Sequence, residues 1–312
     1  MTVAERRAAM ERDDEFTVKP LRDREEIRSL LETRRAYTAY ALGQLDPVLF
    51  RQSEWWIARG MDREALLLHS RGGLGHATFA LGESAALEAL LMTHPGARQT
   101  FLTCEVHHVD TVLRYFDLDH RQTMILMRVT PGEFRPLHDN IEVRRMTGAD
   151  ARTINALYRT DGVPSYYSPR QVDESVYYGA ERDGRLVAIA GTHVISPASG
   201  IAVVGNVYTH PNYRGRHLAQ ATTSAVTLRL LRTCRDVVLS VDPANAPAVR
   251  AYERLGYREV ARLVEGAAVR RDASGVNTTM RRIAARLRGR GVGGELVRVP
   301  ATSARAAEAE EG

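Results

Sequence analysis

The chain has 312 residues, 44% hydrophobic and 26% charged, with a formal net charge of +5. This length and apolar content favour two globular domains and exclude a chain too polar to build a core. Because Lys19 is the only lysine among 43 basic residues, the arginine bias reflects codon composition before it indicates a nucleic-acid partner.

Cysteine content and hydropathy indicate which cellular compartment to expect. Cys104 and Cys234 are far apart in sequence, which favours a reducing compartment and no disulfide framework. Residues 1–15 are charged, lack the apolar core of a signal peptide and are expected to be a flexible N-terminus. Because no apolar run approaches the ~18 residues of a membrane span, we expect a soluble, cytoplasmic protein.

The N-terminal half is expected to alternate strands and helices. Gly72 to Gly75 suggests a phosphate loop, but a hairpin is favoured because no helix start follows at the required distance. The predicted helices are 25–34, 36–42, 84–92 and 109–116, and the predicted strands are 65–68, 74–81, 100–104 and 122–129.

The C-terminal half repeats this alternation. Residues 278–288 predict a basic helix, for which a solvated face is favoured over a nucleic-acid or acidic partner because no aromatic residues interleave the arginines. Residues 301–312 are rich in Ala and Glu and predict disorder. The other predicted helices are 149–158, 170–175, 218–231 and 246–255, and the strands are 139–146, 176–182, 185–194, 201–209, 237–241, 258–264 and 269–271.

One stretch combines an apolar strand, a polar turn and a helix. Residues 203–209 are apolar and β-branched, the turn contains Pro211 and Gly215, and a helix starts at Leu218. Free amides at a helix N-terminus bind anions, and Arg214 and Arg216 add positive charge. The pattern indicates a site for a pyrophosphate. An ordinary strand–loop–helix connection with two solvated arginines would have the same sequence pattern.

A second stretch follows the strand at 237–241. Asn245 is a natural helix N-cap, Pro247 suits a first turn, and Gly256 suits the residue after a helix. These signals predict a three-turn helix with Tyr252 near its end.

The two stretches resemble the signatures of the GNAT superfamily of N-acyltransferases, in the family's order, over about residues 140–262. Arg214 and Ala219 fill the ends of the acyl-CoA motif, whose central Gly is replaced by His217. We expect His217 to have negative φ within the first helical turn, where no Gly is needed. The resemblance implies an acetyl-CoA or other acyl-CoA site formed by Val207, Tyr208, Thr209, Arg214, Gly215, Arg216, His217, Leu218, Ala219, Asn245 and Tyr252.

The resemblance also implies a mechanism. A main-chain N–H near Val207 or Tyr208 would polarise the thioester carbonyl, and Tyr252 would protonate the departing thiolate, unless Tyr252 is only a core residue. No carboxylate lies in residues 201–209, so Asn206 and Tyr208 are the polar candidates on this strand, with His210 and His193 as weaker bases. Tyr166 and Tyr167 would line the acceptor pocket or simply pack on their loop.

The two halves are related by an offset of 137 residues. It places Tyr115 on Tyr252 and Leu102 on Leu239, which predicts a mixed α/β fold with two GNAT-like domains in tandem, similar to the glycine N-acyltransferase-like branch. Residues 77–82 fall on Arg214 to Ala219 without a basic residue, so one cofactor site is expected per chain. The predicted domains are 16–135, diverged, and 138–271, catalytic, followed by the basic helix and tail of 272–312.

Two functions remain open from the sequence. The first is an N-acyltransferase that moves an acetyl or short acyl group onto a primary amine of a small molecule, an amino acid or a protein. The second is a non-catalytic acyl-CoA-binding sensor or interaction module. No metal, no membrane and no nucleic-acid partner are expected, and the oligomeric state stays open.

Overall fold

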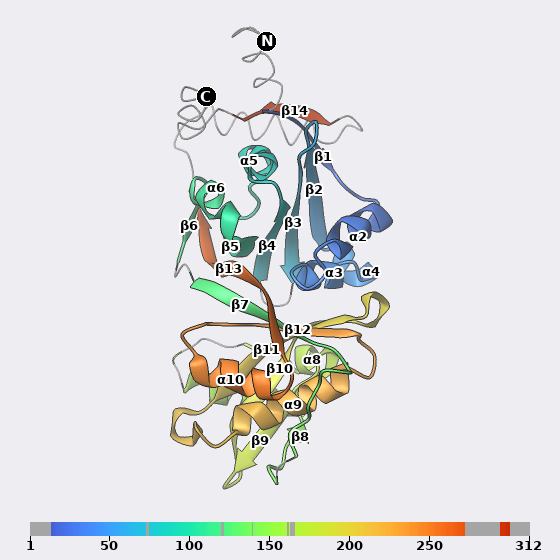
Figure 1. The fold of residues 1–312 in the computed structure, drawn as a ribbon. Helices are drawn as coiled ribbons and strands as arrows, with labels where there is room; N and C mark the ends of the chain where they lie inside the picture. The colour runs from blue at the N-terminus through green and yellow to red at the C-terminus, as the bar shows by residue number, and fades with distance from the viewer. Residues whose placement is uncertain are drawn as a thin grey trace, which may run out of the picture. The chain divides into compact units, whose positions relative to one another are not determined.

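The computed structural model describes residues 14–72, 75–119, 122–138, 140–160, 162, 166–271 and 294–299. The predicted basic helix at 278–288 and the tail at 301–312 lie outside these residues. Within the described part, the fold mixes helices with parallel and antiparallel strands, as the sequence predicted (Figure 1).

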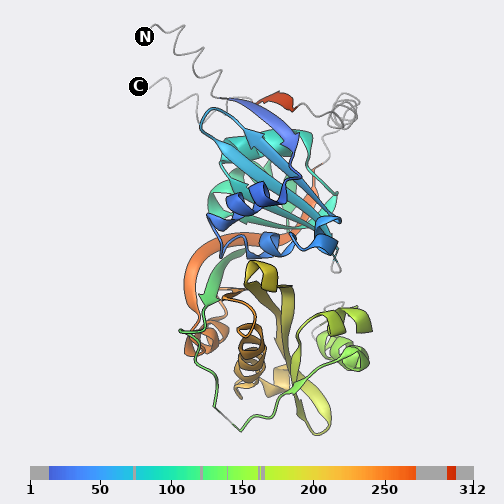
Figure 2. The same ribbon diagram turned by 90° about the vertical axis from the view of Figure 1, so that its right-hand side faces the viewer.

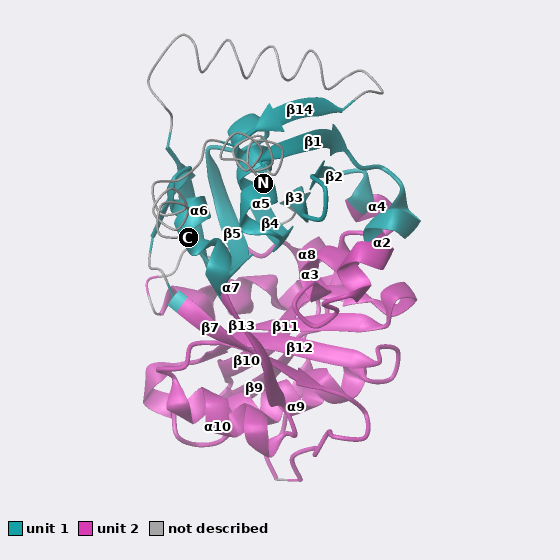
Figure 3. Ribbon diagram, turned by 45° about the horizontal axis from the view of Figure 1, so that its top comes forward, with its two compact units in different colours: residues 1–27, 50–122, 264–312 teal, residues 28–49, 123–263 magenta. Residues whose placement is uncertain are grey.

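The chain forms two compact units (Figure 3). Unit 1 contains residues 1–27, 50–122 and 264–312, and unit 2 contains residues 28–49 and 123–263. The units are therefore not two consecutive segments divided near residue 136. Residues 28–49, expected in the N-terminal domain, belong to unit 2, and so does most of the strand at 122–129.

Unit 1 is a sheet of strand order β14-β1-β2-β3-β4-β5-β13, and β6 also pairs with β13. The pairings are antiparallel from β14 to β4 and parallel between β4 and β5. Its elements are β1 (Glu15–Pro20), α2 (Arg24–Glu32, shared with unit 2), β2 (Ser53–Arg59), β3 (Glu64–Gly72), β4 (Gly75–Gly82), α5 (Ser84–Thr93), β5 (Gln99–Glu105), α6 (Val109–Leu113), β6 (Phe116–Leu118), the second half of β13 (Arg258–Arg270) and β14 (Glu295–Arg298).

Unit 2 is a sheet of order β13-β7-β12-β11-β10-β9-β8. Its helices are α3 (Ala39–Gly43), α7 (Ala151–Arg159), α8 (Pro169–Glu174), α9 (Leu218–Leu230) and α10 (Ala246–Arg254), with α4 (Pro47–Phe50) at its edge. Its strands are β7 (Gln122–Val129), β8 (Arg144–Arg145), β9 (Tyr178–Arg182), β10 (Arg185–Ser196), β11 (Ile201–Thr209), β12 (Asp236–Val241) and the first half of β13.

The order of elements repeats along the chain. From β1 to α6, the chain runs through a short strand, the helices α2, α3 and α4, three antiparallel strands, a helix, a parallel strand and a helix. The chain from β8 to α10 has the same order, with the two helices α7 and α8 in place of the first three. The tandem architecture predicted from the 137-residue offset is confirmed at the level of the fold.

Several predicted elements differ from the structure at their ends. The strand expected over 139–146 is only Arg144–Arg145, and the strands expected at 258–264 and 269–271 are one continuous strand. Strands β1, β2 and β14 were not predicted, and Glu15, expected in the flexible terminus, belongs to β1. In β1 the alternation is present, with Phe16 and Val18 buried and Thr17 exposed between them, but it spans only these few residues.

The helices of unit 2 lie on two faces of its sheet. Figure 2 shows α7 and α8 on one face and α9 and α10 on the other. The core around β7, β11, β12 and α10 buries Val129, Val204, Val237 and Tyr257. Helices α9 and α10 therefore lie on the same face of the sheet. No helix among the described residues is long and apolar enough to cross a membrane.

Helix α9 buries Leu218 and Ala221 of its apolar residues but leaves Leu228 exposed. Leu228 is 47% exposed, whereas Thr223 and Thr227 are fully buried. The Thr227 hydroxyl donates to the Thr223 carbonyl at 2.8 Å and is also 2.7 Å from the Tyr257 hydroxyl. These partners compensate the burial of the Thr227 hydroxyl, whereas the buried hydroxyl of Thr223 has no hydrogen-bond partner among the described residues.

Candidate functional site

Strands β11 and β12 separate after a short parallel pairing. Their register covers only Ile201↔Asp236, Ala202↔Val237 and Val203↔Val238, although β11 continues to Thr209. From Val204 onward, one edge of β11 therefore has no partner in β12. This separation leaves main-chain groups of β11 available to bond to a ligand.

A bulge lies in β11 where the strands separate. Ile189 pairs with Tyr208 and Gly191 with Gly205, so β11 has one more residue than β10 in this interval. Asn206, within this interval, has φ of +54°, a left-handed conformation that Asn tolerates better than most residues. The bulge changes the direction of the following main chain, Val207 to Thr209.

The loop between β11 and α9 is held by local contacts. The Arg214 guanidinium donates through Nε to the carbonyl of Thr209 at 3.2 Å, and the Arg216 guanidinium lies 5.2 Å from the centroid of the Tyr213 ring. The His210 ring accepts the N–H of Asn212. These contacts hold Arg214 beside the end of β11.

His217 corrects the sequence interpretation of this loop. We expected residue 217 inside the first helical turn with negative φ, but His217 precedes α9 and has φ of +58°. Gly215 is also left-handed, with φ of +76°. The family's glycine at position 217 is therefore explained by a positive φ, and His217 adopts it at a cost of about 1 kcal/mol.

Helix α10 begins and ends as predicted. The Asn245 side chain accepts the N–H of Ala248 at 3.2 Å, Pro247 lies in the first turn, and Gly256 has φ of +92° after the last turn. A Cβ at Gly256 would also lie 2.0 Å from the carbonyl oxygen of Glu133. Glycine is required there by both conformation and close approach.

A cavity of about 720 Å³ opens between the end of β11, the N-terminus of α9 and α10. It is lined by ten predicted site residues: Val207, Tyr208, Thr209, Arg214, Gly215, His217, Leu218, Ala219, Asn245 and Tyr252. Arg216, Asn206, Tyr166 and Tyr167 are not among its lining residues.

Two arginines of the cavity were not predicted. Arg250 and Arg254 lie one turn apart on α10, and both line the cavity and are exposed. Together with Arg214 they place three guanidiniums around one opening. Their spacing of four along a predicted helix was the available signal, because residues at i and i+4 share one face.

Tyr252 lines the cavity and is 7% exposed. Burial raises the pKa of its hydroxyl to about 12. The phenol is therefore protonated at neutral pH and can donate a proton. Its ring lies 6.1 Å from the ring of Tyr257, so it also contributes to the core, and the catalytic and packing interpretations are compatible.

Among the described residues, the cavity lining includes no Asp or Glu. The Tyr208 hydroxyl is 2.9 Å from the Thr160 hydroxyl, and the Asn206 amide donates to Tyr177 at 2.9 Å. His193, on β10, stacks against the backbone of Gly205, where a Cβ would lie 2.0 Å from Nε2. Of these three polar candidates Tyr208 alone lines the cavity, and none is a carboxylate base.

The two predicted acceptor-pocket tyrosines have different surroundings. Tyr166 is 89% exposed. Tyr167 is partly buried, and its ring centroid lies 5.3 Å from that of Tyr158 and 5.9 Å from that of Tyr177. Its main chain is held by Asn155, which both donates to and accepts from it.

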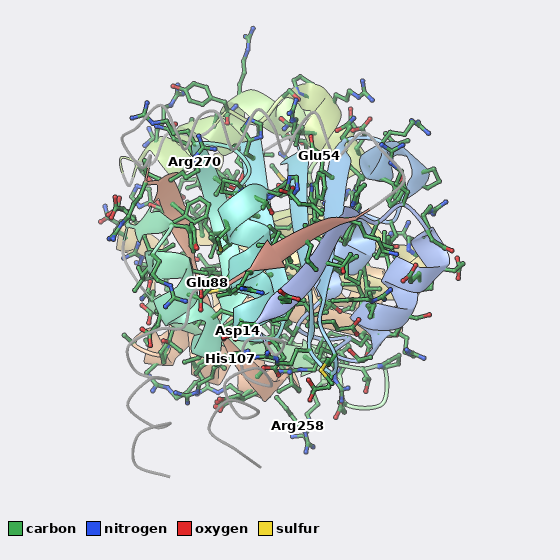
Figure 4. All side chains as sticks on the ribbon, turned by 90° about the horizontal axis from the view of Figure 1, so that it is seen from above. Asp14, Glu54, Glu88, His107, Arg258 and Arg270 are labelled. Atoms are coloured by element: carbon green, nitrogen blue, oxygen red, sulfur yellow. The ribbon has the colours of Figure 1, made fainter. Side chains whose placement is uncertain are left out.

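The described part of unit 1 lacks the loop that borders this cavity. Strand β4 ends at Gly82 and α5 begins at Ser84, whereas eight residues separate β11 from α9. Residues 77–82 are strand, so the 137-residue offset fails in this region because the loop is missing. The imidazoles of His107 (labelled in Figure 4) and His108 both approach the carbonyl oxygen of Gly82 at the end of β4, at 3.2 and 2.6 Å.

The same histidines form a potential metal-ligand group in the described part of the chain. The ligand atoms of Glu105, His107 and His108 lie within 4.8 Å of one another. However, His108 Nδ1 faces the N–H of Glu105 at 3.3 Å, and its Nε2 faces Gly82. The imidazole is occupied on both nitrogens by main chain, which gives the group a structural role.

Residues 148–257 match the acetyltransferase (GNAT) family. This segment contains the bulge, the α9 N-terminus and α10. It is a GNAT domain. The match covers 110 of the 312 residues, so the assignment concerns this domain and not the whole chain.

The GNAT domain also resembles named proteins. A mycothiol acetyltransferase from Acidothermus cellulolyticus is 40% identical over 101 residues, covering 28% of this chain and 31% of the relative, and one from Thermobispora bispora is 40% identical over 90 residues, covering 27% and 30%. The chain thus spans less than a third of the length of these curated relatives.

Solved structures match over a longer part of the fold. A Drosophila protein superposes with a TM-score of 0.57 at 13% identity, covering 81% of this chain and 98% of that one. A GCN5-related N-acetyltransferase from Kribbella flavida gives 0.53 at 19% identity, covering 77% and 95%. At these identities the likeness establishes the fold alone.

Proposed function

We propose that the chain is an acyl-CoA-dependent N-acetyltransferase that transfers an acetyl or other short acyl group to a primary amine. The observation that carries this proposal is the cavity, which combines a separated strand edge, a helix N-terminus and three arginines. A strand edge suits the amide groups of a pantetheine arm, and the helix end suits a diphosphate. Membership of the GNAT domain in an acetyltransferase family supports the same chemistry.

In the proposed reaction, the amine nitrogen attacks the thioester carbonyl carbon directly. The C–N bond forms, the C–S bond breaks, and the leaving CoA thiolate takes a proton from the Tyr252 hydroxyl. Positioned proton transfer of this kind contributes typically ~10²–10⁴-fold. Because the described cavity lining includes no carboxylate, the amine proton leaves through water or a polar group such as Tyr208 or Asn206.

For the cofactor, Arg214 and the amides after His217 would hold the diphosphate, and Val207 and Thr209 would pair with the pantetheine. Arg216 is stacked on Tyr213 and would add charge at longer range. Leu218, Ala219 and Gly215 would allow close approach of the phosphates, and Asn245 would fix the start of α10.

For the acceptor, we propose a small amine. The relatives are named mycothiol acetyltransferases, so mycothiol-related compounds with a primary amine are the first acceptors to test. Amino acids, as in the glycine N-acyltransferase-like branch, are the second group, and protein amines the third. Tyr166 is exposed enough to contact an acceptor directly, whereas Tyr167 would act through the aromatic cluster.

The missing carboxylate favours a second function, a non-catalytic acyl-CoA-binding module. Two measurements separate the alternatives: acetyl-CoA binding by isothermal titration calorimetry, and thiol release with a panel of amines. Binding together with amine-dependent thiol release supports the enzyme. Binding without release from any amine supports the module, and no binding of any CoA thioester overturns both.

A further inference from the structure

A hydrogen bond links α7 to the bulge of β11. Tyr158, at the end of α7, donates its hydroxyl to the carbonyl oxygen of Asn206 at 2.5 Å. Tyr158 is 8% exposed, and its ring packs against those of Tyr167 and Tyr208, with centroids 5.3 and 5.7 Å away. Burial raises the pKa of this hydroxyl well above its usual value, so it is protonated and available as a donor.

Asn206 is held a second time through its side chain. Its Nδ2 donates to the hydroxyl of Tyr177 at 2.9 Å. Asn206 is also the residue with φ of +54°, a conformation that persists only where surrounding contacts fix it. Two tyrosines, Tyr158 in α7 and Tyr177 just before β9, therefore fix the orientation of the peptide group that joins Asn206 to Val207.

The two ends of that peptide face opposite ways. The described chain has no cis peptide bond, so the N–H of Val207 points away from the carbonyl that Tyr158 binds. The alternation of the strand agrees: His210 N donates to Val187 O in β10 at 2.8 Å, which directs the amides of Thr209 and Val207 to the other edge. At that edge β12 has separated, and Val207 lines the cavity.

We propose that Tyr158 is a positioning residue whose hydrogen bond to the Asn206 carbonyl aims the Val207 N–H at the thioester carbonyl of the bound acyl-CoA. This rests on the proposed acetyltransferase function and deepens it. A fixed donor stabilises the oxyanion that forms when the amine attacks, because no energy is spent turning the peptide during the reaction. Tyr158 belongs to α7, which lies across the sheet from α9 and α10 (Figure 2), and it is not among the residues that line the cavity.

Removal of the hydrogen bond between the Tyr158 hydroxyl and the Asn206 carbonyl has two effects on the peptide. The hydroxyl donates to the carbonyl of the same amide whose N–H is the proposed donor, so the bond polarises that amide and makes the N–H a stronger donor. Without it, the carbonyl of Asn206 loses a buried partner and the peptide is free to tilt. Both changes weaken the hydrogen bond to the thioester and leave the phosphate cradle at Arg214 unchanged.

The test compares the full chain with Tyr158→Phe, which removes only the hydroxyl. The main readout is the infrared carbonyl stretch of carbonyl-labelled acetyl-CoA bound to the protein, which reports hydrogen bonding to the thioester and needs no amine. We expect the stretch to move toward that of free acetyl-CoA, kcat to fall about 10-fold as one hydrogen bond is lost, and KM for acetyl-CoA to stay within about twofold.

Tyr257→Phe is the matched control. It removes a buried hydroxyl of the same unit that lies 2.7 Å from the Thr227 hydroxyl, so it reproduces the loss of a core hydrogen bond. It should lower stability while leaving the carbonyl stretch in place. If Tyr158→Phe lowers stability by a similar amount and the stretch stays in place, Tyr158 is only structural and the proposal is overturned.

A second variant tests the proposal even if Tyr158→Phe does not fold. Site-specific 3-fluorotyrosine at position 158 keeps the ring and strengthens the hydroxyl as a donor, so the stretch should move further from the free value; an unchanged stretch overturns the proposal. The failure of the broader function is seen separately, because wild-type protein that binds no acetyl-CoA has no bound carbonyl band at all.

Discussion

The Tyr115 hydroxyl donates a hydrogen bond to the Glu88 carboxylate across 3.3 Å. Glu88 is also paired with Arg114 at 2.5 Å, and the buried position raises the pKa of Tyr115. Tyr252, which the 137-residue offset places on Tyr115, instead lines a cavity. Two tyrosines at equivalent positions of the repeat thus have different surroundings. Tyr115 is bonded to an ion pair in unit 1, whereas Tyr252 lines the cavity in unit 2.

This contrast gives the first prediction. Tyr252→Phe should lower kcat by about 10²-fold or more, because a positioned acid is lost, while acetyl-CoA still binds. Tyr115→Phe is the control, since it makes the same change at the equivalent position of unit 1, and Tyr115 does not line the cavity. Thiol release at saturating acetyl-CoA measures both, and equal rates for Tyr252→Phe and wild type would assign Tyr252 to packing.

The second prediction concerns the diphosphate. Reversing both loop charges, Arg214→Glu with Arg216→Glu, should weaken acetyl-CoA binding about 10- to 100-fold, because charge-assisted hydrogen bonds are replaced by repulsion. The effect should shrink as salt is added. Titration calorimetry at two salt concentrations measures both effects.

The control for the loop arginines is Arg229→Glu with Arg232→Glu. Both are exposed, near the opposite end of α9, and neither lines the cavity. The net charge changes equally in the two double variants. If both bind acetyl-CoA equally well, the cradle assignment is wrong.

The third prediction follows from the left-handed conformation of His217. His217→Gly relieves that strain but gains freedom in the unfolded chain, so the Tm should rise by only about 1–2 °C, with acetyl-CoA binding kept or tightened. His217→Val should lower the Tm by about 3 °C, because a β-branched residue is poorly accommodated at positive φ. Scanning calorimetry ranks the three proteins, and a Val variant as stable as the Gly variant would contradict the conformation.

The fourth prediction concerns acid stability. The Arg144 guanidinium and the Thr147 N–H lower the pKa of Asp150 from 3.8 to about 2. Because the folded-state pKa is lowered, the ionised carboxylate stabilises the fold above about pH 4, and this stabilisation is lost as the pH falls toward 2. Asp150→Asn should therefore lower the Tm at pH 7 by about 2 °C, a small value because Arg144 is exposed, and not at pH 2.

Asp62→Asn is the comparison for that measurement, because it removes an exposed carboxylate from a turn of unit 1. It should change the Tm by less than Asp150→Asn at pH 7. If Asp150→Asn changes the Tm equally at pH 7 and pH 2, ionisation of Asp150 makes no contribution to stability.

The sequence determined the local parts of the GNAT domain. Asn245, Pro247 and Gly256 specify the start and end of α10 through groups within a few residues, and Asp183-Gly184 specifies the two-residue turn between β9 and β10. Such signals depend on dihedral angles and near neighbours, so they can be read without the fold. The same holds for the lack of an acidic residue in β11.

The tertiary structure alone showed that two further arginines share the cavity with the predicted residues, and which contacts hold the bulge of β11. Arg250 and Arg254 join Arg214 only because α10 packs beside the end of β11. The bond between Tyr158 and Asn206 spans 48 residues, and no local pattern indicates it. The expectation of a negative φ at His217 was wrong. The sign of that angle depends on the direction in which the loop enters α9, and this direction is set by tertiary packing.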